Sequence, residues 1–154
     1  MHLKRILIVA VLAAGTLGIG GPATASTDGI DFIETRTTGS KEVPGPGDPN
    51  GKGNFKAVLT ADSMCYRISA RKIETPVAAH IHVGGVDVAG PVVITLMVPT
   101  RSGVVECIKA VPDGEDSSVT MSKTELDGLR SAPGGFYVNV HTPSFPAGAI
   151  RGQL

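Results

Sequence analysis

The run Phe136-Tyr137-Val138-Asn139-Val140-His141-Thr142 alternates polar and apolar side chains along its length. Alternation of this kind, with β-branched residues at the apolar positions, is typical of a β-strand that buries one face. Successive side chains of a strand point to opposite faces. We therefore expect Tyr137, Asn139 and His141 to share one face, opposite a face formed by Phe136, Val138 and Val140.

A second run, Ala79-His80-Ile81-His82-Val83-Gly84, has the same pattern. By the same count His80 and His82 share a face. If the two strands are neighbours, the imidazoles of His80, His82 and His141 gather on one side of one sheet. This grouping is the arrangement in the sequence that is best suited to carry chemistry.

The rest of the chain reads as short strands separated by turn residues. Strands are predicted at about 30–37, 54–60, 64–73, 78–83, 92–98, 104–111, 118–121, 136–142 and 149–154. Residues 39–53 are too rich in Gly, Pro, Asp and Asn for a regular element. Ser122 and Glu125 fit a capping box that opens a helix of about two turns, which ends at Pro133-Gly134-Gly135. The pattern predicts an all-β sandwich or barrel with one short helix.

The N-terminus has the features of a secretory signal peptide. Lys4 and Arg5 precede an apolar run from 6 to 14, and Ala23-Thr24-Ala25 supplies small residues for cleavage before Ser26. The alternative is a retained anchor, but the apolar run is shorter than the roughly 20 residues of a membrane span. We expect residues 1–25 to be removed and residues 26–154 to form a single secreted domain outside the membrane.

Charge and cysteine content narrow the class of protein. Cleavage would remove Lys4 and Arg5, which leaves 12 basic against 14 acidic residues, without a Lys/Arg run to bind nucleic acid. Cys65 and Cys107 are the two cysteines, and each lies in a predicted strand. In an oxidising compartment a disulfide between them is favoured over two buried thiols. A redox role would require closely spaced cysteines such as C-x-x-C, which the sequence lacks.

The histidines allow two interpretations. Side chains two apart on a strand can converge on one ion, and a third imidazole would complete a set suited to Cu(II) or Zn(II). Alternatively, the imidazoles form hydrogen bonds to backbone, Tyr137, Asn139 or Arg151 and join sheet to loop. Asn139 could bridge strands or orient a metal-bound histidine. Arg151 could bind an anion, or pair with an acid such as Glu42.

Nucleophilic catalysis is not indicated. Ser144 lies near His141, but Pro143 and Pro146 make that stretch a rigid turn, and G-x-S-x-G does not occur. No Gly-rich phosphate loop precedes a helix. We expect no catalytic residues and no enzyme activity, with a metal-dependent redox activity as the remote alternative.

Several segments together resemble the CHRD (chordin-type) domain, in particular its secreted bacterial single-domain members. These segments are Glu42-Val43-Pro44, Ala79-His80-Ile81-His82, Gly90-Pro91-Val92-Val93, residues 136–142 and the ending Phe145-Pro146-Ala147-Gly148-Ala149-Ile150-Arg151-Gly152-Gln153-Leu154. The resemblance covers nearly all of residues 30–154 and implies an immunoglobulin-like, Greek-key β-sandwich. It also implies a secreted, non-catalytic binding or structural module for an unidentified extracellular protein or cell-surface ligand. The alternative is an extracellular Cu or Zn protein using His80, His82 and His141.

Overall fold

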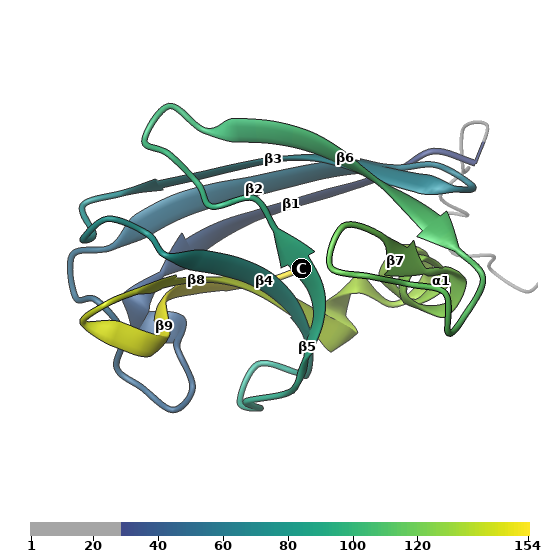
Figure 1. Cartoon of the computed structure of the whole chain (residues 1–154). Coiled ribbons are helices and arrows are strands. Elements are labelled where there is room, and N and C mark those ends of the chain that lie inside the picture. Colours follow the sequence, from purple (N-terminus) through teal and green to yellow (C-terminus); the bar gives the residue numbers. More distant parts are fainter. Residues whose placement is uncertain (1–28) are drawn as a thin grey trace, which may run out of the picture.

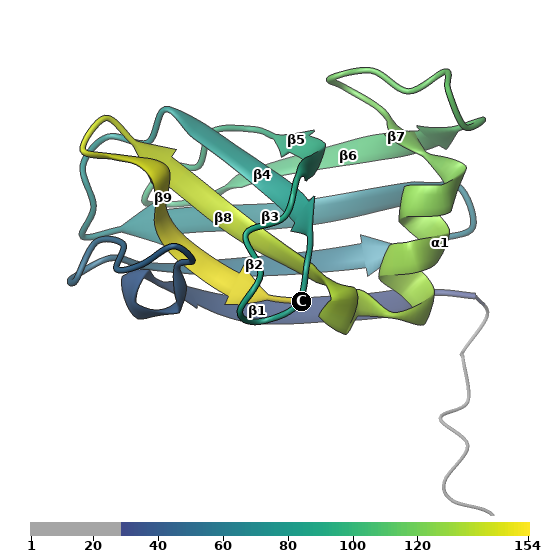
Figure 2. The same cartoon turned by 90° about the horizontal axis from the view of Figure 1, so that it is seen from below.

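The computed structural model describes residues 29–154 of the chain (Figures 1 and 2). The elements are, in order, β1 (Asp31–Thr38), η1 (Gly39–Lys41), β2 (Lys52–Leu59), β3 (Ser63–Arg71), β4 (Ala78–Val83), β5 (Val92–Leu96), β6 (Val104–Val111), β7 (Met121–Ser122), α1 (Lys123–Ser131), η2 (Pro133–Gly135), β8 (Phe136–Thr142) and β9 (Phe145–Gln153). Within these residues no helix is long and apolar enough to cross a membrane. The predicted signal peptide, residues 1–25, lies outside the described part.

The strands of the described chain form one nine-stranded sheet in the order β5-β4-β8-β9-β1-β2-β3-β6-β7. All neighbours are antiparallel except β6 and β7, which are parallel. β1 and β9 share one registered pair, Thr38 with Arg151, and the sheet folds over at this junction. Figure 1 shows the result, with β1, β2, β3 and β6 above β4, β5, β8 and β9. The all-β, sandwich-like fold with one short helix is therefore confirmed.

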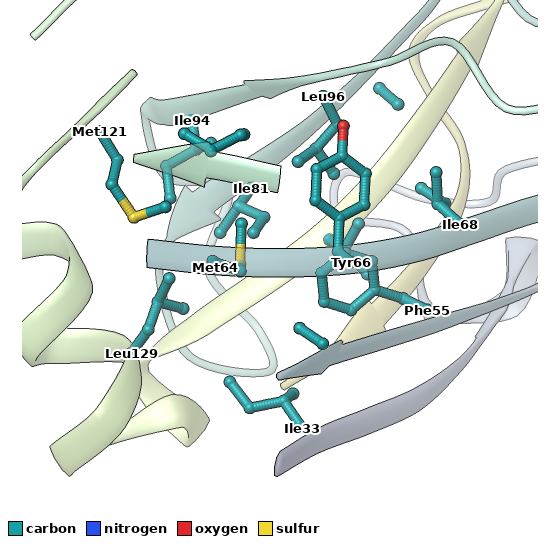
Figure 3. Packing of buried hydrophobic residues seen from close by; sticks show 14 of the residues in the cluster. Ile33, Phe55, Met64, Tyr66, Ile68, Ile81, Ile94, Leu96, Met121 and Leu129 are labelled. Atoms are coloured by element: carbon teal, nitrogen blue, oxygen red, sulfur yellow. The ribbon is translucent and has the colours of Figure 1, made fainter. Parts of the chain in front are cut away.

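The apolar faces of the two layers meet in the core. Residues that point inward from β2, β3 and β4, such as Phe55, Tyr66 and Ile81, are almost completely buried (Figure 3). Helix α1 begins at a complete capping box between Ser122 and Glu125, as predicted. Its buried side chains belong to the same core cluster, so the helix packs over one end of the sandwich (Figure 2).

Two predicted strands differ from the structure by more than two residues at one end. The strand expected at 118–121 is displaced to Met121–Ser122, because the Ser117 amide donates to Thr120 Oγ1 and closes a local turn. The last strand begins at Phe145 and not at residue 149. The sequence predicts that Pro143 to Gly148 only join the last two strands. Instead Thr142 pairs with Phe145 across a tight hairpin, beside a register shift in β8.

The disulfide between Cys65 and Cys107 is present, with the two residues directly opposite on β3 and β6. The interpretation as two buried thiols is wrong, since the pair lies on the outward face of the sheet, where Cys107 is exposed. Phe32 and Val58 align with Cys65 across β1, β2 and β3. The bridge therefore ties strands that are already neighbours, on the solvent side of the sandwich.

Candidate functional site

The three predicted histidines come together as the strand pattern indicates. β4 and β8 are antiparallel neighbours, with His80 opposite Asn139 and His82 opposite Tyr137. One ring nitrogen from each of His80, His82 and His141 lies within 4.8 Å of the others. The register thus confirms that the polar side chains of both strands share a face, opposite the face that enters the apolar core.

This polar face is covered by the loop from 84 to 91 between β4 and β5. The loop approaches through Gly90, whose carbonyl is 2.8 Å from His82 Nδ1 and whose amide donates to Tyr137 Oη at 3.1 Å. His82 and Asn139 keep only 7% and 2% of their surface exposed. The cluster is consequently a second, polar core between the sheet and a loop.

Backbone carbonyls determine which nitrogen of two imidazoles carries the proton. A carbonyl oxygen only accepts, so Nδ1 of His82 donates to Gly90 and Nδ1 of His141 donates to Pro146 at 3.0 Å. A neutral imidazole has a single N–H. The Nε2 atoms of both rings are then lone-pair acceptors, and both point toward Asn139.

The orientation of the Asn139 side-chain amide determines whether these lone pairs accept a hydrogen bond. Its side-chain amide lies 3.0 Å from Nε2 of His82 and 3.0 Å from Nε2 of His141. If the amide presents its NH₂ group, it donates to both rings and closes a structural network. If the amide presents its oxygen, that oxygen and the two Nε2 lone pairs are three acceptors with no donor among them. A cation would then be needed between them. His80 completes the cluster, with Nδ1 3.0 Å from His141 Nε2.

Burial keeps the imidazoles neutral. Desolvation, with smaller contributions from the neighbouring His141 and His82, lowers the pKa of His80 to about 4. Burial also lowers the pKa of His82 and of His141, although hydrogen bonds to Gly90 and Pro146 oppose this effect. Neutral imidazoles with one nitrogen held by a carbonyl are also the form that binds a metal ion.

Tyr137 and Arg151 extend the polar layer beyond the histidines. The Tyr137 ring stacks on His82 with centroids 4.7 Å apart, and the Arg151 guanidinium lies 3.4 Å from the centroid of the same ring. Arg151 is 1% exposed and donates to the carbonyls of Val88 and Gly85 at 2.9 and 2.6 Å. Its main partners are therefore the covering loop and an aromatic ring.

The expected pairing of Arg151 with Glu42 is not found. Among residues 29–154 no ion pair within 4.0 Å joins these side chains. Glu42 is 5% exposed and its Oε1 atom has no hydrogen-bond partner in the described chain. Burial raises its pKa to about 7, with Arg151 and the Val43 amide acting in the opposite direction.

The sequence predicts hydrogen bonds from the histidines to backbone and to Asn139, but it does not identify which backbone groups form them. His82 and His141 contact the backbone carbonyls of Gly90 and Pro146. The side-chain amide of Gln153 holds the start of the covering loop by donating to the carbonyls of Gly84 and Phe136. Such backbone contacts carry no side-chain signature. The signal that could have indicated the covering loop is the Gly84-Gly85 pair directly after the His-x-His strand.

Fold and site together define an all-β module with one disulfide and a partly buried histidine cluster. The chain matches the CHRD domain over residues 33–154, which is nearly the whole described part, and it belongs to the CHRD family. Comparison with curated proteins and with solved structures found no match.

Proposed function

We propose that this protein is exported and acts outside the cell as a non-catalytic binding module of the CHRD family. The observation that carries the proposal is the CHRD match over 33–154 in a chain with a formed disulfide on its solvent face. Disulfides persist in oxidising compartments and are rare in the cytosol. The basic, apolar and small-residue pattern of residues 1–25 supplies the matching export signal.

Expression of the whole chain in a bacterial host, followed by cell fractionation and mass spectrometry, tests export. We expect an N-terminus at Ser26 and one intact disulfide in the exported fraction. Ala25→Arg is the control, because a bulky residue before the cut should block cleavage while the rest of the chain is unchanged. Protein that stays in the cytosol with Met1 and two reduced thiols would refute the proposal.

A second candidate function is transition-metal binding by His80, His82 and His141. It is favoured by the two Nδ1 atoms anchored on carbonyls, which direct both Nε2 lone pairs inward. Ligands at 2.0–2.1 Å from a tetrahedral ion stand about 3.3 Å apart. The present spread of up to 4.8 Å therefore requires the widest pair of ring nitrogens to close in by about 1.5 Å and the Asn139 amide to turn or bind through its oxygen.

Titration of Cu(II) and of Zn(II) into the purified protein tests this candidate. We expect one-to-one binding, a rise in melting temperature with metal, and nitrogen coupling in the Cu(II) electron paramagnetic resonance spectrum. His80→Gln is the informative variant, because His80 has the fewest hydrogen bonds of the three and its loss should cost least in folding. Identical melting of the wild type with and without metal would leave the histidines as a structural network.

A further inference from the structure

The outward surface of β1, β2, β3 and β6, here called the outer face, has a large excess of positive charge. These strands form the upper layer in Figure 1. Glu34 is the single acidic residue among their outward side chains, although residues 26–154 contain 12 basic and 14 acidic residues in all. The registered rows of the sheet show which basic side chains point outward, and all of these are exposed: Arg36, Lys52, Lys56, Arg67, Arg71 and Lys109.

Most of these basic side chains lack a counter-charge. Lys56 pairs with Glu34 at 2.9 Å, and within residues 29–154 no other ion pair involves a side chain of the outer face. Lys52 lies directly opposite Arg71 on the neighbouring strand. Like charges in that position repel each other and weaken a sheet. A negatively charged partner would reduce this repulsion, so the outer face is suited to an anionic partner.

The outer face also carries an apolar row beside the basic residues. This row crosses the four strands in register and consists of Phe32, Val58, Cys65 and Cys107. Val105 lies one outward position away on β6, and Phe32 and Val105 are 75% and 68% exposed. A groove of about 510 Å³ follows these apolar side chains and is also lined by Lys56 and Arg67. Apolar surface and positive charge therefore adjoin on one face.

Two classes of partner match only one of these features. A second copy of this chain, placed face to face, would bring two strongly basic surfaces together, and their repulsion opposes contact. A soluble polyanion, such as a nucleic acid or an acidic polysaccharide, would neutralise the charges but leave Phe32 and Val105 in water. A partner that matches both features offers negative charge and an apolar environment side by side.

The surface of an anionic bilayer offers both. Its head groups attract lysine and arginine side chains, and the boundary beneath them accepts aromatic and aliphatic side chains. We propose that the outer face binds the surface of an anionic lipid bilayer. Phe32 and Val105 enter the boundary, while Lys52, Arg71 and the other basic residues of this face lie against the head groups. The protein then lies on the membrane and does not span it.

This proposal names a partner for the exported module and in that respect rests on the proposed function. The basic patch is not visible in the sequence as a Lys/Arg run. Lys52 and Lys56 are four residues apart, as are Arg67 and Arg71, and a strand places residues at that spacing on one face. The pairing of β2 with β3 then brings the four charges together.

Co-sedimentation with lipid vesicles tests the proposal. The purified exported protein is mixed with vesicles of phosphatidylcholine alone, and with vesicles of phosphatidylcholine and phosphatidylglycerol in equal parts. We expect saturable binding to the mixed vesicles, little binding to phosphatidylcholine, and weaker binding as sodium chloride is added. Binding is measured on purified protein, so it can fail while export succeeds. If residues 1–25 are retained, variants of the same chain still separate the outer face from that segment.

Two pairs of variants assign the binding to the outer face. Lys52→Gln should weaken binding to the mixed vesicles about fivefold, and adding Arg71→Gln should weaken it further. Lys123→Gln on α1 is the matched control, because Lys123 is exposed and lies outside the outer face. Phe32→Ser should also weaken binding. Its control is Val119→Ser, at a position that is 71% exposed in the loop before β7. Both controls should bind nearly as well as the wild type.

Several results would overturn the proposal. Binding to neither kind of vesicle, or equal binding to both, would exclude an anionic bilayer as the partner. Binding that Lys52→Gln and Phe32→Ser leave unchanged would place the contact on another surface. Binding of dextran sulfate without binding of vesicles would identify a soluble polyanion as the partner. Self-association that Phe32→Ser abolishes, again without binding of vesicles, would identify a second copy. If Phe32→Ser is poorly folded, Val105→Ser takes its place.

Discussion

The guanidinium of Arg151 lies over the ring of Tyr137, 3.4 Å from its centroid. His82 stacks on the same ring, and β8, which carries Tyr137, lies between β4 and β9 in the sheet (Figure 2). The ring therefore links the histidine cluster to the buried guanidinium of Arg151. A cation–π contact that is shielded from water contributes on the order of 2 kcal/mol, which helps hold a buried arginine that lacks an ion-paired carboxylate.

The raised pKa of Glu42 predicts a stability profile of definite sign. Its folded-state pKa is about 7 against an ordinary value of 4.5, so the folded state binds the proton more tightly. This contribution is fully present below about pH 4.5 and is lost as the pH rises through 7. The shift corresponds to about 3 kcal/mol.

Glu42→Gln should remove that pH dependence. As the pH rises from below 4.5 to above 7, the wild type should lose about 3 kcal/mol of unfolding free energy that the variant keeps. The histidines, whose pKa values are lowered, lose stability at acid pH in both proteins, so the difference between them cancels this effect. Urea unfolding across the pH range measures it, and parallel profiles would contradict the assignment.

Asn139→Leu should destabilise the protein by about 2–4 kcal/mol at neutral pH. The substitution leaves the Nε2 atoms of His82 and His141 buried without their amide partner, and each unsatisfied group costs about 1–3 kcal/mol. Thr142→Val on the same strand is the matched control. The buried Thr142 hydroxyl has no partner in the described chain, so its removal should be neutral or stabilising. Chemical denaturation of both variants would show the contrast, and equal losses would count against the network.

Loss of the disulfide should lower stability by about 2–4 kcal/mol. The bridge closes a loop with a sequence separation of 42 residues, and the chain-entropy model assigns about 4 kcal/mol to a loop of this size. The double variant Cys65→Ala/Cys107→Ala avoids an unpaired thiol on the exposed face. Its melting temperature should match that of the reduced wild type, whereas a melting temperature equal to that of the oxidised protein would exclude the stabilising role.

Strand pattern alone was sufficient to predict the histidine cluster. Alternation within 78–83 and 136–142 fixes which side chains share a face, and a side-chain period of two leaves little freedom of register. Both strands have the predicted bounds. The pairing of Cys65 with Cys107 could be predicted too, because the chain contains two cysteines.

Asn139 could be named as a partner of the histidines, but the loop groups that contact them could not be predicted. Whether His82 meets a carbonyl, a metal or water depends on how the 84–91 loop folds over the sheet, and that is set by long-range packing. The same holds for Glu42, which was expected to pair with Arg151. Its backbone follows a short 3-10 turn, which places the carboxyl against Gly47 and Gly148 and out of ion-pairing distance of the guanidinium.

Gly148→Ala should destabilise the protein more than Gly114→Ala. Both glycines have positive φ, 146° and 84°, so alanine is strained at either position. Gly114 faces open space, whereas a methyl group at Gly148 would collide with the carboxyl of Glu42. We expect the Gly148 variant to lose about 2 kcal/mol beyond its control. Adding Glu42→Ala should recover much of that excess, because the two residues are in contact and their effects do not add. Urea unfolding measures these effects. If the stability losses of Gly148→Ala and Glu42→Ala simply add in the double variant, the collision is relieved elsewhere and Gly148 does not fix Glu42.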